Sequence, residues 1–296
     1  MLKKNCPICE GSDFKKVYNS KLPSNKDLID FSGRKTPDGY HYEMVRCTKC
    51  DILYAREIYD ETFSNDLYEK SEFDYVNEIN GLKKTYSRCI VEATEKTTKE
   101  NFLEIGCGNG FMLEEAKLIG FKSVVGVEPS KIAYDKSDTN TKEKIIKKIF
   151  NVNDFESNAF DIVFIAMIIE HVVDVNSFLR DITKILKPGG KVVCICHNER
   201  HLLSKILKDK HPIINDEHVV VFGKNSLRIF FEKHNFKNIK IKNLKNYYSM
   251  KYWLGMLPLN KKLKKIFMKI FNIFKIDKKI IGLKAGNLYL IAEKKQ

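Results

Sequence analysis

Three glycines at alternate positions, Gly106, Gly108 and Gly110, follow a short apolar run and precede a helical pattern. Residues 101–105 read as a strand and residues 111–119 as a helix. Glycine lacks a Cβ atom, so this loop can turn sharply and approach a ligand closely. The helix that follows presents free backbone amides at its start, which suits a carboxylate or phosphate. The sequence therefore predicts a ligand-binding turn between a strand and a helix.

The same alternation of strands and helices continues along the chain. Strands are predicted at 123–127, 145–150, 160–166 and 191–196, and a helix at 176–186. A further helix is predicted at 225–235, then strands at 236–244 and 287–292. Alternating strands and helices indicate a parallel sheet covered by helices on both faces, which is an α/β fold.

An acidic residue at the end of the second strand strengthens the case for a nucleoside ligand. Glu128 lies 20 residues after Gly108, where a carboxylate can accept both ribose hydroxyls of an adenosine. A dinucleotide-binding loop would read Gly-x-Gly-x-x-Gly. The loop here reads Gly-x-Gly-x-Gly, which argues against NAD.

Five segments resemble, in order and spacing, the motifs of class I S-adenosylmethionine-dependent methyltransferases. They are Glu104–Gly110, Glu128–Ser130, Phe160–Asp161, Ile169–His171 and Leu186–Gly190. The resemblance covers roughly residues 99–200. It implies a Rossmann-like methyltransferase sheet and S-adenosylmethionine as methyl donor.

The resemblance also implies a set of cofactor-binding residues. The loop with Gly106, Cys107, Gly108 and Gly110 would pack on the methionine part of the cofactor, and Glu104 would orient its amino group through that loop. Glu128 would bind the ribose, Asp154 and Phe155 would bracket the adenine, and backbone near Ala166 would line the methyl-donor site. From the residues alone, Asp154 could equally be a helix cap or a turn residue.

Four of the eight cysteines form two pairs, Cys6 with Cys9 and Cys47 with Cys50. Two residues between cysteines allow both thiolates to face one point, and two such pairs complete a tetrahedral four-cysteine site for Zn²⁺. Four thiolates leave no open position for water, so the predicted zinc is structural. Surface thiols in chance proximity are the alternative.

The acceptor side is less well marked by the sequence. Glu217 and His218 precede the helix predicted at 225–235 and are the candidate catalytic pair. A four-cysteine zinc domain combined with this pair resembles bacterial sugar C-methyltransferases and related surface-glycan methyltransferases, in which the matching position holds the acid–base residues. We expect a packing or capping role for His171. Tyr75 and Tyr86 could form a lid over the cofactor or pack between helices.

The net charge of +14 is concentrated in the last third of the chain. Residues 202–296 contain 22 Lys and Arg against 6 Asp and Glu, whereas residues 1–201 contain 30 against 32. Within this part, residues 260–276 predict an amphipathic helix with lysines on its polar faces. The segment 260–281 could contact a membrane surface or a phosphate-rich partner, or dock on the protein's own core.

These observations give a complete set of predictions. The domains are a zinc-binding domain (1–56), a helical linker or lid (57–98) and a methyltransferase domain (99–296), with a basic helical insertion at 247–283. The function is methylation of a small molecule, a sugar or nucleotide-sugar in surface polysaccharide biosynthesis. The alternatives are an RNA methyltransferase, disfavoured because clustered arginines and an aromatic-basic platform are missing, and a zinc-organised binding protein without catalysis.

The chain is also predicted to be cytoplasmic. Its longest apolar run, residues 162–169, is too short to cross a bilayer, and its first residues lack the apolar core of a signal peptide. In a reducing compartment the cysteines are thiols or metal ligands rather than disulfides.

Overall fold

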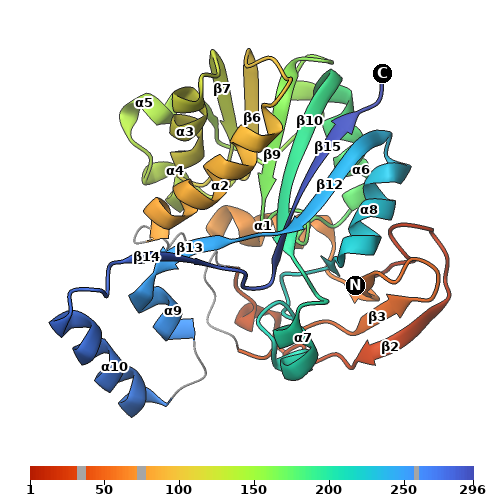
Figure 1. Ribbon diagram of the computed structural model, residues 1–296. Coiled ribbons are helices and arrows are strands. Elements are labelled where there is room, and N and C mark those ends of the chain that lie inside the picture. The colour runs from red at the N-terminus through yellow and green to blue at the C-terminus, as the bar shows by residue number, and fades with distance from the viewer. Residues whose placement is uncertain (32–37, 72–77, 257–259) are drawn as a thin grey trace.

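The computed structural model describes residues 1–31, 38–71, 78–256 and 260–296. Its largest element is a seven-stranded sheet with the order β12-β15-β10-β9-β6-β7-β8 (Figure 1). Strands β6, β7, β8, β9 and β10 are parallel to one another, whereas β15 is antiparallel to both β10 and β12. The strands are β6 (Asn101–Ile105), β7 (Ser123–Val127), β8 (Ile145–Ile146), β9 (Phe160–Ala166), β10 (Leu186–His197), β12 (Phe236–Asn243) and β15 (Asn287–Lys294). The predicted Rossmann-like sheet is confirmed.

Helices cover both faces of this sheet. Successive buried residues of the central strands therefore pack into two different apolar clusters, one on each face. In β9, Ile162 and Phe164 pack with α2 (Ile79–Ala93) and α3 (Phe111–Ile119). The alternate residues Val163 and Ile165 pack with α6 (Val175–Ile185) and α8 (Lys224–Lys233). The shorter elements are α4 (Lys131–Asp135), α5 (Thr139–Lys142) and the 3-10 turn Val152–Asp154.

Two predicted strand boundaries are wrong for local reasons. The strand predicted at 145–150 stops at Ile146, because the Lys148 amide donates to the Ile146 carbonyl and turns the chain away from the sheet. The strand predicted from residue 191 begins at Leu186 and changes register before Lys191. The intervening residues include Pro188, which has no amide hydrogen, and Gly189 with a φ of 76°.

The N-terminal residues form a smaller sheet that includes a strand from far along the chain. Its order is β11-β4-β3-β2. The strands are β2 (Phe14–Tyr18), β3 (Met44–Cys47), β4 (Leu53–Ala55) and β11 (Val220–Val221). β1 (Leu2–Lys3) pairs with β5 (Glu57–Ile58), and residues Lys26–Leu28 form a 3-10 turn. The predicted domain limits stay a prediction. This sheet nevertheless combines three strands of the predicted zinc-binding domain (1–56) with one strand, β11, of the predicted methyltransferase domain (99–296).

The remaining elements lie at the end of the main sheet toward which β9 points (Figure 1). They include α1 (Glu61–Lys70), α7 (Leu202–Leu207) and the 3-10 turn Lys208–Lys210. β13 (Asn246–Ser249) and β14 (Ile280–Leu283) form a two-stranded sheet that carries α9 (Met250–Met256) and α10 (Lys261–Ile273). Among the described residues, no helix has the length and apolar character needed to cross a membrane.

Candidate functional site

The four predicted metal ligands are brought together by two turns with the same geometry. The amide of Glu10 donates to the Cys6 carbonyl, and the amide of Asp51 donates to the Cys47 carbonyl. Glu10 and Asp51 have φ values of 62° and 57°, the left-handed conformation that lets each turn close behind its second cysteine. Asp51 after the last cysteine thus adopts the same left-handed conformation as Glu10 after the second.

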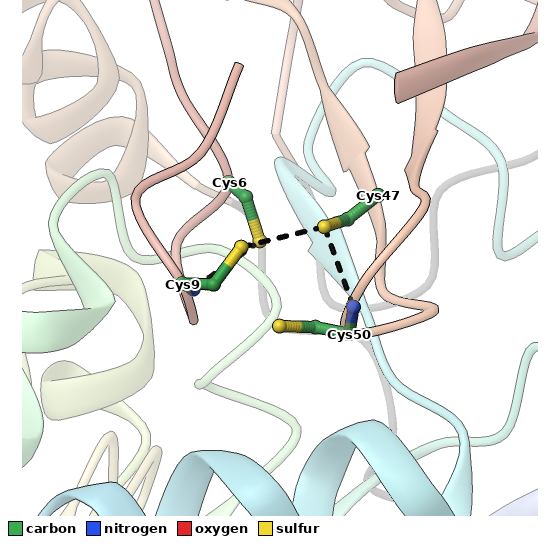
Figure 2. Close-up of side chains that lie close together, drawn as sticks. All are labelled: Cys6, Cys9, Cys47 and Cys50. Carbon is green, nitrogen blue, oxygen red and sulfur yellow. Dashed lines mark hydrogen bonds between the residues drawn. The ribbon is translucent and has the colours of Figure 1, made fainter. Parts of the chain in front are cut away.

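The donor set fits Zn²⁺. The Sγ atoms of Cys6, Cys9, Cys47 and Cys50 all lie within 4.8 Å of one another and point toward a common centre (Figure 2). Amides of Cys9 and Cys50 point at the Sγ atoms of Cys6 and Cys47, at 3.5 and 3.4 Å, which favours thiolates there. Four convergent sulfurs are the ligands of a structural zinc site, which is how these residues would hold the ion.

The glycine loop is tied to the end of the neighbouring strand by Glu128. Its carboxylate accepts hydrogen bonds from the amides of Gly108 and Ser130, both at 2.8 Å. The pKa of Glu128 is raised above its usual value, because the effect of burial exceeds the lowering by the two amides. The loop residues Gly106, Gly108 and Gly110 all have positive φ, from 57° to 77°. Glu128 therefore fixes the shape of the loop as well as being the predicted ribose ligand.

Glu104 lies buried beneath this loop with an unused acceptor. Its side chain is 3% exposed, and its Oε2 atom has no hydrogen-bond partner within the described residues. Burial, and then the nearby Glu128, raises the pKa of Glu104 well above its usual range. A cation placed against this unpaired oxygen would favour the ionised carboxylate, so the position fits a cationic ligand group such as the amino group of S-adenosylmethionine. The glycine cradle and the two acids therefore fit this cofactor.

Two other predicted cofactor residues, Asp154 and Phe155, have protein partners. Asp154 ends a 3-10 turn and pairs with Lys148 at 2.6 Å. Phe155 stacks on Phe150 with ring centroids 5.9 Å apart. Ala166 is the last residue of β9, and the next residue, Met167, has a φ of 58°, so the chain turns abruptly there. Their contacts with a cofactor stay a prediction, as do those of Cys107, which is buried in the loop.

Glu217 and His218 are both buried, and His218 is held in one ring orientation. Its Nδ1 atom lies 2.9 Å from the Ile213 carbonyl. Because a carbonyl only accepts, Nδ1 carries the hydrogen and Nε2 keeps its lone pair. Burial lowers the pKa of His218 to about 4, so the ring is neutral at neutral pH. A neutral imidazole in this tautomer can accept a proton at Nε2.

Two further histidines meet His218 at the carboxyl ends of adjacent strands. The His171 ring lies 4.6 Å from it and the His197 ring 5.1 Å, centroid to centroid. His197 ends β10, while His171 follows β9, and its Nδ1 lies 3.8 Å from a carboxylate oxygen of Glu217. We call His171, His197, His218 and Glu217 the histidine cluster.

Sequence reasoning missed several members of this region. Tyr68 of α1 packs edge-on against His171 at 5.7 Å, and its hydroxyl lacks a hydrogen-bond partner in the described part of the chain. Glu170 anchors the His197 amide with one oxygen, while its other oxygen has no partner there. His197 ends β10 and Glu170 follows β9 by four residues, so both could have been found from the rule that the carboxyl ends of parallel strands meet at one edge of the sheet. Nothing in the sequence marks Tyr68.

Of the two tyrosines considered for a lid, the structure describes only Tyr86. Tyr86 is buried against Phe111 and Phe164, with centroid distances of 6.4 and 5.6 Å, so it packs between a helix and the sheet. Tyr75 lies outside the described residues.

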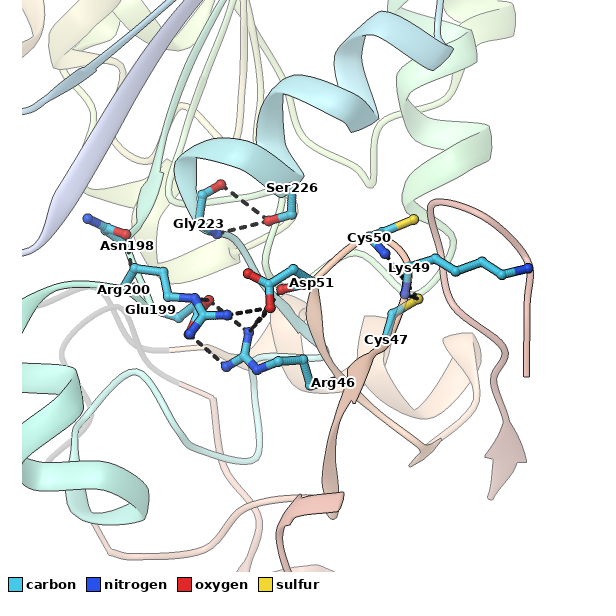
Figure 3. Close-up of polar contacts among 10 residues, drawn as sticks. All are labelled: Arg46, Cys47, Lys49, Cys50, Asp51, Asn198, Glu199, Arg200, Gly223 and Ser226. Atoms are coloured by element: carbon cyan, nitrogen blue, oxygen red, sulfur yellow. Dashed lines mark hydrogen bonds and ion pairs between the residues drawn. The ribbon is translucent and has the colours of Figure 1, made fainter. Parts of the chain in front are cut away.

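Ion pairs fix the region of the four cysteines to the seven-stranded sheet. Arg46, next to the ligand Cys47, pairs with Glu199, just beyond β10 (Figure 3). Arg200 contacts both Glu199 and Asp51, the residue that follows the ligand Cys50. Next to the paired strands β4 and β11, the Ala55 amide donates a hydrogen bond to the Val219 carbonyl at 2.8 Å. The two cysteine turns and the segment that carries Glu217 and His218 are thus held together.

A family model described as a methyltransferase domain matches residues 80–241, more than half of the chain. The chain belongs to the methyltransferase-domain family. Among solved structures, this methyltransferase is similar to an S-adenosylmethionine-dependent methyltransferase from Archaeoglobus fulgidus, with a TM-score of 0.50 and 19% identity. That similarity covers 79% of this chain and 100% of the other, and it concerns the fold.

Relatives of known sequence agree with the family assignment. The methyltransferase is 31% identical over 129 residues to the ubiquinone biosynthesis O-methyltransferase of Vibrio atlanticus, covering 42% of this chain and 53% of that protein. It is 30% identical over 163 residues to an uncharacterized methyltransferase of Schizosaccharomyces pombe, covering 50% and 57%. The chain spans about half the length of the curated relatives it matches.

Proposed function

We propose that this protein methylates a hydroxylated small molecule, a sugar or nucleotide-sugar, that binds beside the histidine cluster. The observation that carries the proposal is the position of His218, buried between His171 and His197 with its Nε2 lone pair kept by the Nδ1 contact to Ile213. A methyl acceptor must usually lose a proton, and a positioned imidazole is a common group to take it.

S-adenosylmethionine, when bound, supplies an electrophilic methyl carbon. Glu104, Glu128 and the glycine loop would hold it, and Ala166 ends the strand between that loop and the histidine cluster in the sheet order. The protein's task is then to align the acceptor and to remove a proton from it. In the proposal, His218 takes the proton, and Glu217 stabilises the resulting positive charge among the histidines.

The unpaired polar atoms support an acceptor with several hydrogen-bonding groups. The hydroxyl of Tyr68 and one oxygen of Glu170 are buried without partners among the described residues. Buried polar groups are normally satisfied, so unpaired ones near a site mark places that a ligand can fill. Together with the resemblance to zinc-containing sugar methyltransferases, this favours a polyhydroxylated acceptor.

A second candidate acceptor is a phenol, because several matching relatives are named ubiquinone biosynthesis O-methyltransferases. Those matches cover only 42% of this chain, so they say little about the residues of the acceptor side. The sugar therefore stays the first proposal, and phenols belong in the experiment.

The test is a turnover assay with zinc-loaded protein, S-adenosylmethionine and a panel of nucleotide-sugars and dihydroxyphenols, read as S-adenosylhomocysteine formed. We expect turnover with a nucleotide-sugar and a loss of about 100-fold in kcat for His218→Asn. The matched control is His234→Asn, because His234 is also buried and its Nδ1 also contacts a carbonyl, that of Phe230, at 2.8 Å.

The outcomes separate the parts of the proposal. Turnover with phenols alone would overturn the sugar proposal and keep the methyltransferase. Failure of the zinc-loaded protein to bind S-adenosylmethionine in calorimetry would overturn the enzymatic proposal and favour a binding protein. Equal activity of His218→Asn and His234→Asn would remove His218 from the reaction.

A further inference from the structure

One face of α10 exposes a continuous row of large apolar side chains. Spacings of three and four residues place them on the same side of a helix. They are Leu263, Ile266, Phe267, Ile270, Ile273 and the C-cap residue Phe274, with exposed fractions of 41, 53, 40, 40, 75 and 70%. We call this row the α10 stripe. The alternative that α10 docks its apolar face on the protein's own core does not hold for these six residues.

The helix is nevertheless anchored to the protein by another of its faces. Met268 and Phe271 are less exposed than the stripe, and the Lys264 ammonium donates to the Gly255 carbonyl in α9 at 2.6 Å. In Figure 1, α10 projects away from the main sheet, connected to it through β13 and β14. The stripe is therefore presented outward by a supported helix.

The charge around the stripe has one sign. Residues 260–281 contain eight lysines and one aspartate. Lys262, Lys265 and Lys269 are exposed, and they repeat at the same helical spacing on the side next to the stripe. An apolar row flanked by lysines is the pattern of a helix that lies in the interface of an anionic bilayer.

A second exposed apolar helix lies at the same end of the molecule. In α7, Leu202, Leu203, Ile206 and Leu207 have exposed fractions of 66, 47, 63 and 38%. The neighbouring Lys205, Lys208 and Lys210 are exposed as well. Both α7 and α10 lie toward the carboxyl ends of the parallel strands in Figure 1, the end that carries the histidine cluster.

We propose that the α10 stripe and α7 together bind the surface of an anionic lipid bilayer. The apolar side chains would enter the boundary between headgroups and acyl chains, and the lysines would contact lipid phosphates. Two copies of so basic a segment repel each other, which disfavours a second copy as the occupant. Binding a nucleic acid would use the lysines but leave the stripe in water. This surface is independent of the proposed reaction and would place the histidine cluster near membrane-associated acceptors.

The experiment is co-sedimentation of the full chain with phosphatidylcholine vesicles that contain or lack phosphatidylglycerol. We expect at least about tenfold tighter binding to the anionic vesicles, weakened by added salt. Replacement of Ile266, Phe267 and Ile270 by Ser is expected to weaken this binding about tenfold or more. Replacement of Lys262, Lys265 and Lys269 by Gln is expected to do the same.

Matched controls distinguish this surface from exposed residues in general. Leu118→Ser removes an 80% exposed leucine from α3, and Lys15→Gln with Lys96→Gln and Lys122→Gln removes three exposed lysines elsewhere. Both controls should bind like the original chain. Leu203→Ser with Ile206→Ser in α7 should weaken binding about threefold.

Three results would overturn the proposal. One is absence of binding to anionic vesicles at low salt. Another is unchanged binding by both α10 variants, with folding of each checked by circular dichroism. The last is a concentration-dependent dimer, seen in sedimentation without vesicles and abolished by the α10 substitutions, which would make a second copy the occupant.

Discussion

Arg46 donates two hydrogen bonds to the carboxylate of Glu199, each with a donor–acceptor distance of 3.0 Å. Arg46 precedes the zinc-ligand candidate Cys47, and Glu199 follows strand β10 of the large sheet. The side chains are 20 and 5% exposed. A planar, largely buried pair of this kind fixes both direction and distance, so it sets how the region of the four cysteines meets the methyltransferase sheet.

Removal of this arginine should destabilise the protein. For Arg46→Met we expect a loss of about 2 kcal/mol in the free energy of unfolding, because Glu199 stays buried with only Arg200 as a cation. Chemical denaturation measures it. The control is Lys3→Met, which breaks the exposed pair with Glu57 and should change stability by less than about 1 kcal/mol. Equal effects of the two substitutions would contradict this role for Arg46.

Removal of zinc should impair turnover more than cofactor binding. Strand β4 follows the second pair of cysteines and pairs with β11, which comes two residues after His218. Loss of the metal should therefore displace the catalytic candidates and lower kcat at least about tenfold, since small displacements of reacting groups are costly. The glycine loop belongs to a different sheet, so the Kd for S-adenosylmethionine should stay within about threefold.

Cys47→Ser tests this with metal analysis, turnover and calorimetry on the same preparation. Cys89→Ser is the control, because Cys89 is buried in α2 and should leave the zinc content unchanged. A Cys47→Ser protein without zinc but with full turnover would show that the four-cysteine site does not support the acceptor side.

The proximity of the glycine loop and Glu128 was predictable from the sequence because its information is local. The glycine loop and Glu128 are separated by one helix and one strand, and the regular βα order places them together whatever the rest of the chain does. The paired cysteines are equally local, since each turn closes through hydrogen bonds between neighbours. These features require no knowledge of long-range packing.

The acceptor side depends on contacts between distant segments, which periodicity does not reveal. Val221 pairs with Leu53, and Tyr68 reaches His171 from a helix whose sequence gives no such indication. The sequence also left undecided whether the α10 stripe is exposed. An amphipathic pattern is the same whether a helix packs its apolar face on the core or presents it to solvent.

Glu128→Gln should weaken cofactor binding without unfolding the protein. An amide in place of the carboxylate accepts with one oxygen only, so one of the bonds from Gly108 and Ser130 is lost, together with the charge that would face the ribose. We expect a rise of about 30-fold in the Kd for S-adenosylmethionine by calorimetry. Glu143→Gln, at an exposed position, is the control. An unchanged Kd for Glu128→Gln would exclude Glu128 from the cofactor site.

The histidine cluster should make the protein less stable in mild acid. Burial lowers the pKa of His218 to about 4 and that of His197 to about 3, whereas an unfolded histidine titrates near 6.5. Between pH 6.5 and 4 the unfolded chain therefore binds more protons at these sites, and its free energy falls relative to the folded state. Stability should rise with pH across this window and become independent of these two groups above it.

Substitution isolates the contribution of one histidine. His218→Asn should reduce the slope of unfolding free energy against pH by up to about 1.4 kcal/mol per pH unit between pH 4 and 6.5. Titration of groups elsewhere in the chain, the four cysteines included, is common to both proteins, so it cancels in the difference. Burial raises the pKa of Glu170 to about 7, so this carboxyl has the opposite effect between pH 4.5 and 7. Glu170→Gln should therefore steepen the slope, and a shallower one would mean that Glu170 is ionised in the folded protein.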